Sequence, residues 1–175
     1  MSRTAEFRKI TRKELLSLIL LAAFLSGLSG CQSMMFNQGG QVSQENWISL
    51  GGDGKHSGVW NARDLSVDYQ YARNGSELTL SGKVAFADLI KNSFVLVRYF
   101  HLSVIWVDGQ GNVLGAPGLT SASNMDPEDP EHFSARLTVP GNALYLAFSY
   151  QGQAVESGGR GDSGSPSYFW HYPIH

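Results

Sequence analysis

Alternation of apolar and polar residues with a period of two is the feature that most constrains this chain. Apolar side chains occupy every second position over residues 65–71 and again, apart from Gly82, over 78–86. Successive side chains of a strand point to opposite faces, so this spacing predicts strands with one buried face. The pair Asn74-Gly75 between the two segments is a typical tight-turn sequence. The sequence therefore predicts a β-hairpin.

Other segments extend the same pattern. In residues 94–107 both alternate sets are largely apolar, as expected of a central strand covered on both faces or of a strand that passes from one sheet to the other. A turn over 108–112 leads into a return strand at 113–114. Three further segments alternate or read as short strands, namely 133–139, 144–150 and 168–172. No segment after residue 31 shows apolar spacing of 3.6 over three turns, so helices contribute little.

These strands predict one all-β domain. Seven or eight short strands separated by turns favour a two-sheet antiparallel β-sandwich of immunoglobulin-like architecture, with a small closed β-barrel as the alternative. The chain has a single cysteine, which excludes an intramolecular disulfide framework. The fold must therefore rest on its hydrophobic core.

The first thirty residues have a different character. A basic stretch over 1–14 precedes an apolar block over 15–28, which ends at the small residues Ser29 and Gly30. The block is shorter than the roughly 20 residues that a transmembrane helix needs. A charged head, a short apolar block and small residues are typical of a secretory signal peptide.

The segment Leu28-Ser29-Gly30-Cys31 resembles the lipobox of bacterial lipoproteins at all four positions. This resemblance implies that residues 1–30 are removed, that the Cys31 sulfur carries a diacylglycerol, and that the new amino terminus is acylated. Two or three acyl chains hold a protein stably on a membrane. Gln32 replaces the aspartate that signals inner-membrane retention in this family, which implies an outer-membrane anchor with the domain facing the periplasm.

Residues 31–46 are polar and rich in Gly and Gln, so we expect the acylated cysteine to be followed by a flexible tether, with the sandwich at 47–175. From Cys31 onward the chain has 8 basic against 13 acidic side chains, a net charge of −5. Without a basic run to neutralise phosphates, nucleic acid is not an expected partner.

One segment, Gly161-Asp162-Ser163-Gly164-Ser165-Pro166, resembles the nucleophile segment of trypsin-like serine proteases, except that the family has glycine at Ser165. The resemblance implies that Ser163 needs a histidine and a carboxylate. The candidates for these partners are His56 or His101 with Asp64, Asp68 or Asp108. Only 12 residues follow Ser163, too few to complete such a protease. We interpret the segment as a loop and predict that the protein is not an enzyme.

Metal and cofactor sites are not expected either. His171 and His175 would lie about 13 Å apart on a strand, which is too far for one ion. The acidic segment 126–131 contains two prolines and lacks the glycine that lets a calcium loop turn sharply, so it is interpreted as a solvated loop.

The segment 168–172, Tyr-Phe-Trp-His-Tyr, is the most unusual part of the domain because it places rings on both faces of a strand. It is either covered on both sides or forms an exposed aromatic platform. We expect positions 168, 170 and 172 to face the core and Phe169 and His171 to face outward. The candidate partner-binding residues, for the case of an exposed platform, are Phe169, Trp170 and His171, because aromatic side chains dominate binding interfaces.

Together these features predict a membrane-anchored envelope lipoprotein whose sandwich is a non-catalytic binding or assembly module for an envelope protein or a glycan. Two alternatives remain at this point. One is a glycan- or peptidoglycan-binding module that uses the carboxy-terminal aromatic residues. The other is an envelope hydrolase whose site the sequence does not reveal.

Overall fold

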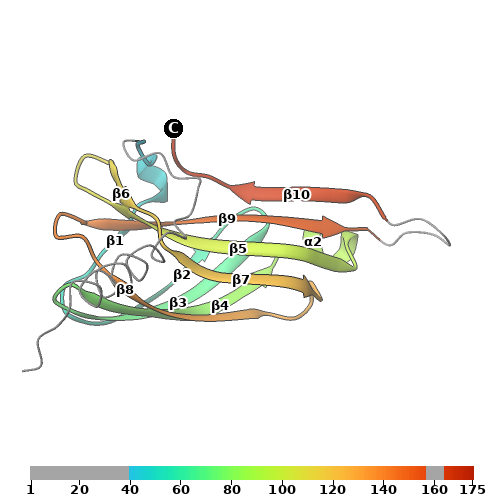
Figure 1. Ribbon diagram of the computed structural model, residues 1–175, viewed down its shortest axis with the longest axis horizontal. Helices are drawn as coiled ribbons and strands as arrows, with labels where there is room; N and C mark the ends of the chain where they lie inside the picture. The colour runs from blue at the N-terminus through green and yellow to red at the C-terminus, as the bar shows by residue number, and fades with distance from the viewer. Residues whose placement is uncertain (1–39, 157–163) are drawn as a thin grey trace, which may run out of the picture. The chain divides into compact units, whose positions relative to one another are not determined.

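Two antiparallel sheets pack face to face, as Figure 1 shows. The structure is a computed structural model and describes residues 40–156 and 164–175. The sheets do not close into a barrel. The predicted β-sandwich is therefore confirmed, and the small closed barrel is excluded.

The smaller sheet has four strands in the order β2-β3-β4-β8. Their bounds are β2 Gly54–Asn61, β3 Leu65–Asn74, β4 Glu77–Phe86 and β8 Glu131–Thr138. The larger sheet has six strands: β1 Ile48–Ser49, β5 Leu96–Val107, β6 Val113–Gly115, β7 Gly118–Met125, β9 Tyr145–Val155 and β10 Pro166–His171. A 3-10 turn, η1, spans Gln44–Asn46, and a short helix, α2, spans Asp88–Ser93.

Strand β5 is central to the larger sheet, as its two-sided apolar pattern predicts. It pairs with β9 along one edge and with β7 and then β6 along the other. Strand β9 in turn pairs with both β1 and β10. Strands β2 and β7 were not predicted, because their serine and glycine residues weaken the apolar alternation.

The predicted hairpin is formed by β3 and β4, but its turn lies one residue later than expected. Asn74 pairs with Glu77, so the loop consists of Gly75 and Ser76. Gly75 has a φ of 59°, which glycine adopts without the steric cost that other residues incur. Its N–H donates a hydrogen bond to Asp53 Oδ1 at 2.8 Å.

The main core lies between the two sheets. Trp106 and Phe100 from β5 and Phe148 from β9 are its largest fully buried side chains. They pack with residues such as Val67 and Leu80 from the smaller sheet, which are also fully buried.

A second apolar cluster covers part of the outer face of the larger sheet. Its buried members are Val42, Ile105, Val107, Val113, Ala116 and Ala147. Val42 pairs with Ile174, and its carbonyl accepts a hydrogen bond from Trp47 Nε1 at 2.9 Å. Residues 40–46, expected in the tether, therefore belong to the sandwich, because Val42 finds an apolar surface made by residues distant in the sequence.

Candidate functional site

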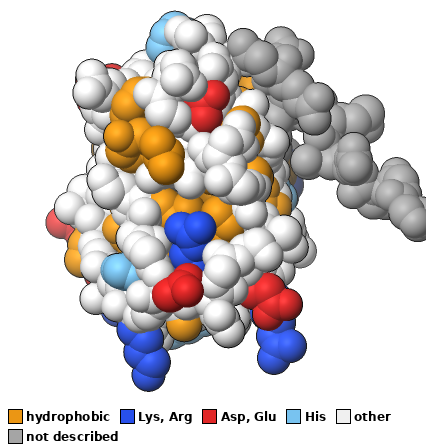
Figure 2. Space-filling view, turned by 90° about the vertical axis from the view of Figure 1, so that its left-hand side faces the viewer, with side chains coloured by type: hydrophobic (Ala, Val, Ile, Leu, Met, Phe, Trp, Pro, Cys, Tyr) orange, Lys and Arg blue, Asp and Glu red, His pale blue; other side chains and the backbone are white. Residues whose placement is uncertain are grey.

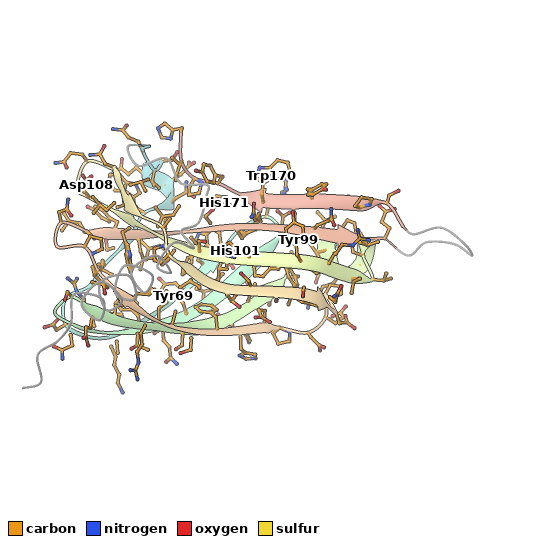
Figure 3. All side chains as sticks on the ribbon, in the orientation of Figure 1. Tyr69, Tyr99, His101, Asp108, Trp170 and His171 are labelled. Carbon is orange, nitrogen blue, oxygen red and sulfur yellow. The ribbon has the colours of Figure 1, made fainter. Side chains whose placement is uncertain are left out.

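The rings of β10 alternate between the core and the outside, but the inward and outward positions are the reverse of those we expected. Phe169 is 3% exposed, whereas Tyr168 and Trp170 are 60% and 62% exposed. His171 is half-buried. The prediction that positions 168, 170 and 172 face the core is wrong, since Tyr172 is also 44% exposed. Of the three candidate binding residues, only Trp170 lies open to solvent (Figure 3).

Phe169 is directed inward because its neighbour in the sheet is a glycine. It pairs with Gly152 of β9, where an added Cβ atom would collide with the Phe169 ring. The ring instead fills space between the sheets, with centroids 5.9 Å from Phe86 and 6.2 Å from Tyr150. Phe169 is therefore a core residue.

His171 contributes to packing between the two sheets. Its ring centroid lies 5.2 Å from that of Trp60 in β2 and 6.0 Å from that of Tyr150. Its Nε2 donates a hydrogen bond to Asn46 Oδ1 at 3.1 Å. Burial lowers the pKa of His171, although the nearby carboxylates of Asp64 and Glu45 oppose this shift.

The outer face of the larger sheet carries two rows of side chains that cross four strands, and all of them except Gln153, which is 7% exposed, are at least partly exposed. The first row is Tyr168, Gln153, Tyr99 and Ser123, and the second is Trp170, Gln151, His101 and Ser121. We call these eight residues the aromatic surface. Adjacent strands lie about 4.8 Å apart, so each row is about 14 Å long, and the rows are about 7 Å apart along the strands.

His101 is held in place within the second row. Its Nδ1 lies 2.7 Å from Ser121 Oγ, and its Nε2 lies 3.0 Å from Ser103 Oγ. Burial lowers the pKa of His101, so the ring is neutral at pH 7. A neutral imidazole has one donor and one acceptor nitrogen, and the two serine hydroxyls satisfy both.

The eight residues of the aromatic surface include no carboxylate, no amine and no guanidinium group. It combines exposed Trp and Tyr rings with amide, hydroxyl and neutral imidazole groups. Such a set can stack on the apolar face of a ligand and exchange hydrogen bonds with its polar groups.

The extent of this surface is set by the second apolar cluster. Along β5, the outward residues Tyr99 and His101 are followed by Ile105 and Val107, which are both fully covered. The covering residues include Val42 and Val113. The carboxy-proximal half of β5 is thus occupied by the chain itself, and the other half is left open.

The sequence predicted only Trp170 among the residues of this surface. Tyr99 was missed because both faces of its strand looked apolar, and Gln151 and Gln153 were missed because they lie beyond the strand expected at 144–150. The alternation of Tyr99, His101 and Ser103 within β5 is the signal that could have indicated its outward face.

The residues considered for a protease-like site form other contacts. Asp64 bonds to Arg63 and Tyr150, Asp68 pairs with Lys83 at 3.6 Å, and Asp108 accepts hydrogen bonds within its own turn. His56 bonds to the carbonyl of Gly52, and His101 bonds to serines. Ser163 lies outside the described residues, as do Cys31 and the rest of the lipobox-like segment.

The acidic segment 126–131 forms a turn between β7 and β8. Asp126 Oδ1 accepts a hydrogen bond from the Glu128 N–H at 2.9 Å, and Glu131 accepts one from Thr120 Oγ1 at 2.8 Å. Within the described part of the chain, no three His, Cys, Asp or Glu side chains are grouped so that they could hold a metal ion.

Two searches for relatives found nothing. The chain matches no protein-family model and no curated protein. Over residues 40–156 and 164–175, no helix is long and apolar enough to cross a bilayer. Fold and surface together define a β-sandwich protein with an uncharged aromatic surface on its larger sheet.

Proposed function

We propose that this protein is a lipid-anchored protein of the bacterial envelope whose β-sandwich binds a glycan through the aromatic surface. The anchor is supported by the segment Leu28-Ser29-Gly30-Cys31 behind a basic and then apolar leader. The binding role is supported by the composition and exposure of the aromatic surface.

One observation carries the binding role: Trp170 and Tyr168 are both about three-fifths exposed, on a surface without formal charge. Large exposed rings are uncommon on a surface that has no partner, and they are enriched where binding energy is concentrated. Sugar rings have apolar C–H faces that stack on aromatic rings, and their hydroxyls can bond to the exposed side chains of Gln151, Ser121 and Ser123. The surface matches both features of a sugar.

Size favours a glycan over a protein partner. The two rows span on the order of 200 Å² at ordinary strand spacing. A standard protein–protein interface buries about 800 Å² on each partner. A single glycan chain laid across β10, β9 and β5 needs only the smaller area.

The test uses full-length protein in a non-ionic detergent, mixed with insoluble chitin or with purified peptidoglycan sacculi. The wild-type protein should sediment with at least one of these polymers, and Trp170→Ala should weaken retention about tenfold or more, the equivalent of about 1.4 kcal/mol. Leu144→Ala is the matched control, since Leu144 is 55% exposed but lies in a loop outside the surface. Equal retention of wild type and Trp170→Ala, or retention on neither polymer, would overturn the proposal.

A further inference from the structure

The outer face of the smaller sheet, opposite the aromatic surface, also carries rows of side chains in register. Its middle row is made of short polar residues, one from each strand: Ser57, Gln70, Ser81 and Ser134. We call this row the serine trough. It crosses all four strands and is about 14 Å long at ordinary strand spacing.

The serine trough is part of a hollowed surface. Two shallow, open depressions of about 850 and 350 Å³ lie on this face, and both are lined by Ser57, Gln70 and Ser81. Longer side chains bound it at Lys55 and Arg136 on one side and at Lys83 and His132 on the other, whereas the low side chains of Ala72 and Thr79 widen it in the middle. An extended chain laid perpendicular to the strands fits this shape.

Basic side chains stand on both sides of the trough. Lys55 and Arg136 are at the ends of one flanking row, and Lys83 and His132 are neighbours in the other. The smaller sheet lies at the bottom of Figures 1 and 2, and Figure 2 shows Lys and Arg side chains projecting from that side of the domain. The flanking rows contain one carboxylate, Asp68, which pairs with Lys83 at 3.6 Å; Glu77 lies one row further out.

This local charge differs from that of the surrounding surface. The described residues contain seven Lys and Arg against twelve Asp and Glu, and three of the seven basic residues flank the trough. Hydroxyl and amide groups along a narrow trough, with cations about 7 Å to either side, complement a chain that carries hydroxyls and regularly spaced anionic groups. A flat lipid surface would meet the projecting cations without entering the trough.

We propose that the serine trough is a second binding site, which takes a glycan chain bearing carboxylates. The hydroxyl and amide groups of the trough bond to the sugar hydroxyls, while Lys55, Lys83 and Arg136 bond to the carboxylates. The site lies on the opposite sheet from the aromatic surface and does not depend on it. The protein could then hold two glycan chains, a neutral one on the larger sheet and an anionic one on the smaller sheet.

The test measures binding of full-length protein, in non-ionic detergent, to polygalacturonate, to neutral dextran and to inorganic polyphosphate. Wild type should bind polygalacturonate and should not bind dextran, and added salt should weaken binding. Arg136→Ala should weaken it about tenfold or more, consistent with the loss of one charge-assisted hydrogen bond. Arg98→Ala, which removes an exposed cation from β5 in the other sheet, is the matched control and should bind as wild type.

A second variant, Ser81→Trp, tests the trough itself. Ser81 points outward at the centre of the face, so an indole there should fill the trough and abolish polygalacturonate binding, while the urea-unfolding midpoint stays close to that of wild type. Arg136 is exposed on the edge strand β8, so its variant remains informative if Ser81→Trp fails to fold. Any one of three results would overturn the proposal. The protein could bind polyphosphate as tightly as polygalacturonate, Arg136→Ala could leave polygalacturonate binding unaffected, or Arg98→Ala could reduce that binding as much as Arg136→Ala does.

Discussion

The hydroxyl of Tyr150 donates a hydrogen bond to Asp64 Oδ2 at 2.8 Å, although 86 residues separate the two in the sequence. Both side chains are buried, with exposures of 3% and 2%. The Arg63 side chain is largely exposed, and its Nε donates a hydrogen bond to the other carboxylate oxygen, Asp64 Oδ1, at 2.8 Å. Burial, together with the hydrogen bond to Asp64, raises the pKa of Tyr150, so the hydroxyl stays protonated and remains a donor. This contact joins β9 of one sheet to the loop that precedes β3 of the other.

Tyr150→Phe should therefore lower the free energy of unfolding by about 1–3 kcal/mol, because it leaves a buried carboxylate without one of its donors. Urea denaturation at pH 7 measures the change. Tyr145→Phe is the control on the same strand, since Tyr145 is only partly buried and packs on Trp47. Equal losses in the two variants would show that the bond to Asp64 adds no stability.

Phe169→Ala and Trp170→Ala should separate the two faces of β10. Removing the buried Phe169 ring should cost about 3–5 kcal/mol, because it leaves a cavity between the sheets. Removing the exposed Trp170 ring should cost less than about 1 kcal/mol. Thermal or urea unfolding of both variants measures this difference. A larger loss of unfolding free energy in Trp170→Ala than in Phe169→Ala would contradict the observation that Phe169 faces the core and Trp170 faces outward.

Gly75→Ala should destabilise the β3–β4 hairpin by about 1 kcal/mol, because alanine is strained at a φ of 59°. Gly141→Ala is a suitable control. Gly141 has no positive φ, and an added Cβ atom would meet nothing within 4 Å. Since alanine also restricts the unfolded chain, this second change should be neutral or slightly stabilising. If both variants unfold alike, the strain argument at Gly75 fails.

Stability should fall as the solution becomes acidic, in part because of His101 and His171. Burial lowers the pKa of both histidines in the folded protein. At pH values between each folded-state pKa and the ordinary value of about 6.5, the unfolded chain therefore binds more protons than the folded protein does. The free energy of unfolding should therefore be fully retained above about pH 6.5 and decline below it. His101→Gln keeps groups able to bond to Ser103 and Ser121, and it should reduce the difference between urea denaturations at pH 8 and pH 5.5. An unchanged difference would exclude a contribution from His101.

Cys31→Ala should abolish acylation and leave the leader uncleaved, because the sulfur is the proposed attachment atom. Metabolic labelling with a radioactive fatty acid in a bacterial host, followed by electrophoresis, measures both effects. A conservative Ser33→Ala change just beyond the cysteine should leave labelling intact. Equal label on wild type and Cys31→Ala would contradict the lipoprotein proposal.

The strands show how much of the fold was predictable. The alternation over 65–71 and 78–86 predicted the hairpin because the pattern depends only on the geometry of a strand with one buried face. Even there the turn was displaced by one residue, since Asn74 is also well suited to a turn and only pairing with Glu77 places it in the strand.

The candidate site was predictable only in part. An aromatic segment at the end of the chain indicated that 168–172 was special, and Trp170 does lie on the exposed surface. The other members come from β5, β7 and β9, and their position beside Trp170 is a consequence of sheet register, which no local pattern contains.

By itself the sequence determined the all-β class and those strands whose alternation is clear, because both follow from local periodicity. Only the tertiary structure decided which face is buried where the alternation is ambiguous. In β10 positions 168–171 all carry rings, so periodicity could not distinguish the two faces there, and the glycine at 152 opposite Phe169 selected the inner one. Likewise Val42 lies in a polar segment, and it became part of the domain because Ile105, Val107 and Ala147 form an apolar surface that it covers. Burial of apolar area depends on neighbours in space, and here those neighbours are distant along the chain.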